Sequence, residues 1–155
     1  ALIGHSFVAP IRRYVVVTDN GEVTYPFDAT QAGNVFPKEE WGGYDDDALL
    51  QAAQLLVHLQ SVANEDGWKS IRKPEDFLAI KFNMFYNNEQ FRKQREAVAR
   101  RITAPKIVKN KDTVKVTFFA WHLIGGQLRE WTIQFSPSLK ITSKQHGQFG
   151  GGGYD

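Results

Sequence analysis

Histidine and carboxylate side chains are the residues of this sequence that could carry acid–base chemistry. The histidines stand far apart in the chain, at His5, His58, His122 and His146. His58 falls in the polar stripe of a predicted helix, and His122 ends a predicted strand. A cleft holding both would support general acid–base catalysis, because imidazole titrates near neutral pH. Asp76 or Glu130 would then supply the acid, but we favour the alternative that each histidine bonds backbone or solvent at the core margin.

Motifs for metal ions, phosphates and activated nucleophiles do not stand out. No two histidines have metal-ligand spacing, and no Gly-x-Ser-x-Gly or phosphate-loop pattern occurs. The carboxylates of Asp45, Asp46 and Asp47 are better explained as the cap of a helix than as cation ligands. Cysteine is absent, which excludes thiolate zinc sites and cysteine nucleophiles. The sequence therefore favours a protein that is not an enzyme and that holds neither metal nor cofactor.

Basic residues are concentrated in one part of the chain. The formal net charge of +2 combines an acidic stretch, 1–80, with 12 acidic and 6 basic residues, and a basic stretch, 81–155, with 5 acidic and 13 basic residues. Ten of the basic residues lie within 81–115. Gathered on one surface, they would steer an anionic partner. The alternative is that the acidic and basic segments pack together and neutralise each other.

We predict a non-catalytic protein-binding module, a subunit or assembly factor of a larger complex, that contacts an acidic surface of a partner protein. Its predicted contact residues lie on an amphipathic helix, 89–102, in the segment after it and in the C-terminal tail. They are Arg92, Lys93, Arg95, Arg100, Arg101, Lys109, Lys111, Phe149 and Tyr154. The two aromatic residues would anchor the tail on the partner.

Two other functions stay open at this stage. The first is binding of single-stranded nucleic acid through the basic region 92–115, with bases stacked on aromatic residues of the following strands. Those residues are Phe118, Phe119, Trp121 and Trp131. Their alternation more often builds a core than a binding platform. The second is a small-ligand or enzyme pocket that reaches His58 or His122.

The N-terminal half predicts a hairpin followed by a helix. β-Branched and alternating segments, 13–18 and 22–27, flank Asn20-Gly21, a pair that favours tight hairpin turns. The acidic triplet at 45–47 then begins a helix that runs to about residue 63. Its polar positions form one narrow stripe, so we expect most of this helix to be buried.

The second half predicts more helix and then strands. Pro74, followed by two acidic residues, predicts the beginning of a helix. The segment 77–86 has both helical and alternating character, and we favour a helix there. After the basic helix 89–102, strands are predicted at 106–108 and 113–123. A hairpin returns through 130–135, and 139–142 adds an edge strand. The glycine-rich segment 147–155 is predicted to be a flexible tail.

The order of elements predicts an α+β fold with helices packed on one face of a mostly antiparallel sheet: an N-terminal hairpin, a helical middle and a C-terminal β-meander. One domain, 1–146, with its tail, 147–155, accounts for the 155 residues. The layout is similar to the cone-shaped nuclear-transport-factor-like and cystatin-like folds. No apolar run approaches the roughly 18 residues of a membrane span, so we expect a soluble chain. The first residue, Ala1, suits an excised domain or a mature form from an organelle or the periplasm, and the compartment is unknown.

Overall fold

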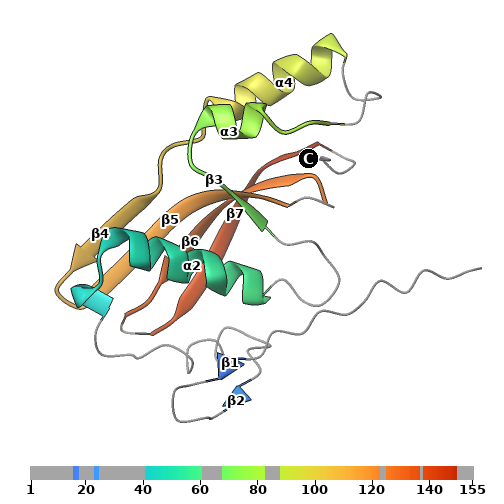
Figure 1. Cartoon of the computed structure of the whole chain (residues 1–155). Coiled ribbons are helices and arrows are strands. Elements are labelled where there is room, and N and C mark those ends of the chain that lie inside the picture. The colour runs from blue at the N-terminus through green and yellow to red at the C-terminus, as the bar shows by residue number, and fades with distance from the viewer. Residues whose placement is uncertain are drawn as a thin grey trace, which may run out of the picture.

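The computed structural model describes residues 16–17, 23–24, 41–60, 68–82, 88–122, 125–136 and 138–149. In chain order the elements are β1 (Val16–Val17), β2 (Val23–Thr24), the 3-10 helix η1 (Trp41–Gly43), α2 (Asp46–Gln60), β3 (Trp68–Ile71), α3 (Pro74–Leu78), α4 (Glu89–Ala99), β4 (Lys106–Asn110), β5 (Thr113–His122), β6 (Gln127–Gln134) and β7 (Lys140–Gln148). Strands β3 to β7 form a five-stranded antiparallel sheet, and β1 and β2 form a separate pair. The predicted α+β order is therefore confirmed, with helices in the middle and an antiparallel meander at the C-terminal end (Figure 1).

The N-terminal hairpin is confirmed at its paired residues. Val16 lies opposite Thr24 and Val17 lies opposite Val23 in antiparallel register. The Asn20-Gly21 turn predicted between them lies outside the described residues.

Strand β5 is the centre of the five-stranded sheet. One edge of β5 pairs with β6, and β6 pairs with β7. The other edge is shared by two strands: β4 pairs with 113–117 and β3 pairs with 119–122. The sheet thus has two halves along β5, one bordered by β4 and the other by β3.

Helix α2 packs on one face of the sheet. Its first turn is capped by Asp45, whose Oδ1 accepts a hydrogen bond from the backbone N–H of Ala48 at 2.7 Å, so the predicted cap is confirmed. The buried side of α2 contacts alternate residues of β5 that point to this face: Val114, Val116, Phe118 and Ala120. Leu55 is 45% exposed, so less of the helix is buried than its narrow polar stripe predicts.

Helices α3 and α4 cover part of the opposite face. Phe119 and Trp121, the intervening residues of β5, point there and share a core with Phe77 of α3 and Val98 at the end of α4. The sequence predicts the helices on one face of the sheet. Helix α2 packs on one face, whereas α3 and α4 pack on the opposite face. Figure 1 shows α2 crossing in front of the strands, and α3 and α4 near the upper end of the sheet.

Of the described residues in the segment 77–86, which has both helical and alternating character, only the first two are helical. Helix α3 begins at Pro74, as predicted, and its Asp76 Oδ2 accepts from the backbone N–H groups of Arg72 and Lys73 at 3.0 and 3.2 Å. It ends at Leu78, well before residue 86. Phe82 then has an isolated β-bridge, and 83–87 lie outside the described residues.

The C-terminal part of the chain enters the fold further than predicted. Strand β7 continues to Gln148, with Gly147 opposite Leu128, so 147 and 148 belong to the sheet rather than to a flexible tail. Phe149 follows with 4% exposure, and its backbone N–H donates to the carbonyl of Gly126 at 2.7 Å. A side chain at Gly147 would place Cβ 2.6 Å from the Phe149 ring, which explains the glycine there. The domain boundary predicted at 146 is corrected accordingly, while 150–155 lie outside the described residues.

Candidate binding surfaces

Helix α4 turns most of its predicted contact residues outward, but not Arg95. Successive helical residues are rotated by about 100°, so position 95 falls between 91 and 98 on the same side of the helix. Phe91, Val98 and Ile102 all pack into the core with α3. Arg95 therefore belongs to the inner side, and its assignment to the outer cationic face is corrected.

The guanidinium of Arg95 holds the end of α3. Its Nη2 lies 2.7, 2.5 and 2.7 Å from the carbonyl oxygens of Phe77, Leu78 and Ile80. The guanidinium carbon is also 4.5 Å from the centroid of the Phe82 ring, within cation–π range. Burial lowers the pKa of Arg95 from its ordinary value, but an arginine stays charged at neutral pH. This side chain is a clamp inside the molecule and is not available to a partner.

Two predicted contact residues are ion-paired. Lys93 Nζ lies 2.7 Å from Glu89 Oε1, one helical turn earlier, and both side chains are largely exposed. Lys109 Nζ lies 3.0 Å from Asp46 Oδ1 and 2.6 Å from the carbonyl of Tyr44, so it joins β4 to the start of α2. Each pairing offsets one of the positive charges that were expected to be uncompensated.

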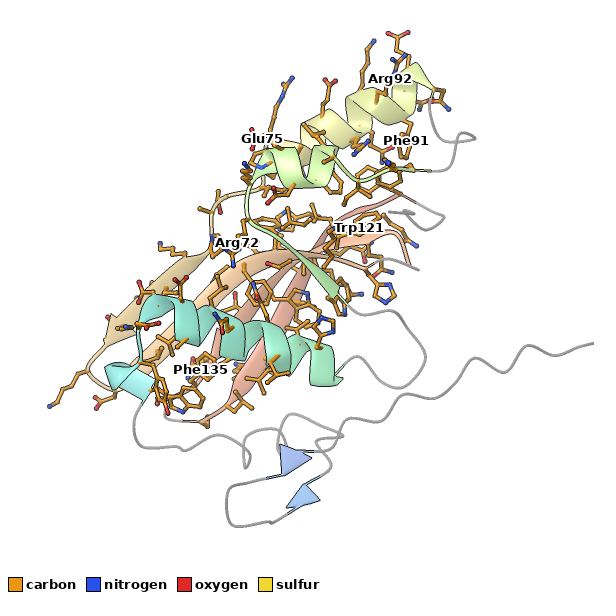
Figure 2. The ribbon with its side chains drawn as sticks, in the orientation of Figure 1. Arg72, Glu75, Phe91, Arg92, Trp121 and Phe135 are labelled. Carbon is orange, nitrogen blue, oxygen red and sulfur yellow. The ribbon has the colours of Figure 1, made fainter. Side chains whose placement is uncertain are left out.

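Three arginines of α4 and its C-terminal end remain exposed without an ion pair to any described carboxylate: Arg92, Arg100 and Arg101. Leu78 of α3, next to α4, is 42% exposed. We call Leu78, Arg92, Arg100 and Arg101 the helix surface. Figure 2 shows Phe91 on the side of α4 that faces Trp121, and Arg92 on the far side.

A second cationic area lies on the sheet. Beyond the part covered by α3 and α4, the face opposite α2 carries four exposed lysines: Lys106, Lys115, Lys140 and Lys144. The register places Lys115 opposite Gln134, which is itself opposite Lys140, so these three residues form one row across the strands. We call the four lysines the lysine face. Lys106 and Lys115 belong to the ten basic residues within 81–115, whereas Lys140 and Lys144 lie outside that range, so the charge distribution along the chain does not predict this surface.

The histidines are arranged differently from the predicted cleft. His146 Nε2 lies 2.8 Å from Glu130 Oε2, and its ring packs on Phe119 at a centroid distance of 5.1 Å. His122 is buried in β5, and its ring lies 4.7 Å from the Trp68 ring in a tilted arrangement. Its Nδ1 accepts a hydrogen bond from the backbone N–H of Gly125 at 2.8 Å. Glu130 thus pairs with a histidine that sequence reasoning did not select. The register shift after Leu128 brings His146 to this face, and spacing alone gives no signal for it.

An open pocket of about 240 Å³ lies where the β4–β5 turn meets η1. Its lining residues are Trp41, Gly42, Gly43, Asn110, Lys111, Asp112, Thr113, Val114 and Ser136. Lys111, a predicted contact residue, is therefore at this turn, apart from α4. The predicted ligand site requires His58 or His122 in its lining, and neither histidine lines this pocket.

The aromatic residues considered for base stacking are all buried. Phe118, Phe119, Trp121 and Trp131 are each at most 9% exposed and divide between the two cores. Phe149, the predicted anchor, is likewise in the core, and Tyr154 lies outside the described residues. A stacking platform for single-stranded nucleic acid is therefore absent from these strands.

The fold and its surfaces define an α+β domain in which a five-stranded antiparallel sheet carries helices on both faces. Comparison of the chain with protein-family models, curated proteins and solved structures gives no match. The similarity in element order to nuclear-transport-factor-like and cystatin-like folds stays a prediction. Among the described helices none is long and apolar enough to cross a membrane. In the same part of the chain, no three histidine or acidic side chains gather as metal ligands.

Proposed function

We propose that this chain is a non-catalytic protein-binding module, a subunit or assembly factor that docks on an acidic surface of a partner protein through the helix surface. The observation that carries this proposal is the exposure of Arg92, Arg100 and Arg101, without ion pairs to described residues, together with the exposure of Leu78 on the contacting helix α3. Arginine is enriched in protein interfaces and among their hot spots, because its planar guanidinium binds carboxylates with two hydrogen bonds.

The rigidity of α4 supports the same proposal. The inner side of α4 is held by Val98 and Ala99 in the core and by the three carbonyl contacts of Arg95. Asn88 caps the helix, since its Oδ1 accepts from the Phe91 backbone N–H at 2.8 Å. Side chains presented from a fixed helix lose little backbone entropy on binding, which favours affinity.

Reversing the charge of two arginines tests the proposal. We expect the double variant Arg100→Glu/Arg101→Glu to bind its protein partner with at least tenfold lower affinity, because like charges would then face each other across the interface. The measurement is quantitative crosslinking of the full chain in extract, followed by titration of the identified partner.

The matched control is Lys106→Glu/Lys115→Glu, which makes the same charge change on the lysine face. The proposal requires this control to retain the partner. A partner lost equally from both variants, or retained by the arginine variant, would contradict docking through the helix surface.

A further inference from the structure

The lysine face has the charge of a polyanion-binding surface. On this face, the register positions of β4 to β7 among the described residues hold one carboxylate, Glu130, which lies opposite Lys144 and 2.8 Å from His146. The four lysines make no ion pair with any described residue. Lys106, Lys115 and Lys140 therefore have no carboxylate opposite them in the register, and the face as a whole carries a net positive charge.

The composition of the lysine face differs from that of a protein interface. Lysine is depleted at the centres of protein interfaces, where aromatic residues and arginine are enriched. The residues between the lysines are polar: Thr117 and Thr132 face each other with hydroxyl oxygens 3.2 Å apart, and Gln134 is partly exposed. Lysine, threonine and glutamine are among the side chains that contact phosphate oxygens in nucleic-acid complexes.

The same composition favours binding of a nucleic-acid duplex over binding of a single strand. Single-strand binding depends on aromatic side chains that stack with the bases. On this half of the sheet the exposed apolar residue is Val108, and the nearest aromatic of β5 on the same face, Phe119, is 2% exposed. A duplex needs no stacking partner, because its phosphates are offered along the outside.

The spacing of the lysines also suits a duplex. Neighbouring strands lie about 4.8 Å apart, so Lys115 and Lys140 are separated by roughly 10 Å across the sheet. Lys140 and Lys144 are about 13 Å apart along β7. A duplex carries one charge per 1.7 Å, or about eight phosphates over that length, enough to face all four lysines.

We propose that the lysine face binds the phosphate backbone of double-stranded nucleic acid without reading its sequence. This is a second binding activity, on a surface separate from the helix surface. Four lysine–phosphate contacts predict that the logarithm of the binding constant falls with the logarithm of salt concentration with a slope of about −3.6. Raising the salt from 50 to 200 mM would then weaken binding about 150-fold.

The test is fluorescence anisotropy of a labelled 20-base-pair duplex titrated with the full chain at several salt concentrations. The fourfold variant Lys106→Ala/Lys115→Ala/Lys140→Ala/Lys144→Ala should lose binding at least 100-fold at 50 mM salt. The fourfold lysine-to-arginine variant should retain binding, and circular dichroism with thermal unfolding should show that both variants fold.

A charge-matched control removes the same number of positive charges from α4 and the two residues that follow it: Arg92→Ala/Lys93→Ala/Arg100→Ala/Arg101→Ala. This control should keep the wild-type salt slope, although it should lose the protein partner of the helix surface. An equal decrease of the salt slope in this control and in the fourfold lysine-to-alanine variant would show that net charge, rather than the lysine face, drives binding. That result would overturn the proposal.

Three other outcomes would also overturn the proposal. They are no duplex binding by the wild-type chain at 50 mM salt, tighter binding of the corresponding single strand, and binding of a poly-glutamate chain of equal charge at least as tightly as duplex. The last result would assign the lysine face to an acidic protein. These three outcomes leave the result expected for Arg100→Glu/Arg101→Glu unchanged. Failure of duplex binding by the lysine face and failure of protein docking by the helix surface are therefore distinguishable.

Discussion

Replacing Phe149 with alanine is expected to lower the free energy of unfolding by about 3 to 5 kcal/mol, the usual cost of removing a buried phenyl ring. Phe149 is 4% exposed, and its ring centroid lies 5.4 Å from Phe77, 5.7 Å from Phe91 and 5.9 Å from Trp121. Those rings come from α3, α4 and β5, so the variant loosens the layer that carries the helix surface. Urea denaturation followed by tryptophan fluorescence measures the change.

Leu55→Ala is the control for Phe149→Ala. Leu55 is also a large apolar side chain, but it is 45% exposed on α2. Its removal should cost about 0.5 kcal/mol or less, since exposed substitutions away from special features have small effects. Equal destabilisation by the two variants would contradict the placement of Phe149 in the core.

Arg95→Ala is expected to cost about 3 kcal/mol, although the residue is a charged side chain on a surface helix. Its guanidinium donates to the carbonyls of Phe77 and Ile80, both residues being buried, and hydrogen bonds from charged donors are worth roughly 1.5 to 3 kcal/mol each. The variant leaves these carbonyls unpaired at the end of α3. The same urea denaturation measures the loss.

Two further variants separate the role of Arg95 from its charge. Arg92→Ala removes the same charge three residues earlier, from the exposed side of α4, and should change stability by about 0.5 kcal/mol or less. Arg95→Lys keeps the charge, but its shorter side chain ends before the position of Nη2, the atom that contacts all three carbonyls, so only part of the stability should return. Full stability in Arg95→Lys would show that charge alone matters and that the carbonyl contacts do not.

The elements of the fold were predictable because local chemistry specifies them. Asp45 caps α2, Pro74 begins α3 and Trp131 alternates with Thr132 along β6, as expected. The division of helices between the two faces was not predicted. It depends on which side of β5 each helix covers, and both sides of that strand are apolar in its second half, from Phe118 to Trp121.

The candidate surfaces were less predictable, because charge was counted along the chain rather than in space. Helical geometry alone would have turned Arg95 inward, since it lies between Phe91 and Val98 on one side of α4. The lysine face needed the strand register, which brings Lys140 and Lys144 from β7 near Lys115. The glycines around Phe149 predict a flexible tail, whereas Gly147 makes room for the Phe149 ring in the core.

We propose that the helix surface, rather than the lysine face, docks a protein partner. Leu78 and Val108 give a matched pair of exposed apolar positions, at 42% and 37% exposure, one on each surface. We would place the photoreactive residue p-benzoylphenylalanine at each position of the full chain and irradiate it in extract. Docking through the helix surface predicts a protein adduct of defined mass from position 78 that disappears in the Arg100→Glu/Arg101→Glu background and is absent from position 108. The same adduct from position 108, or no protein adduct from position 78, would contradict the account.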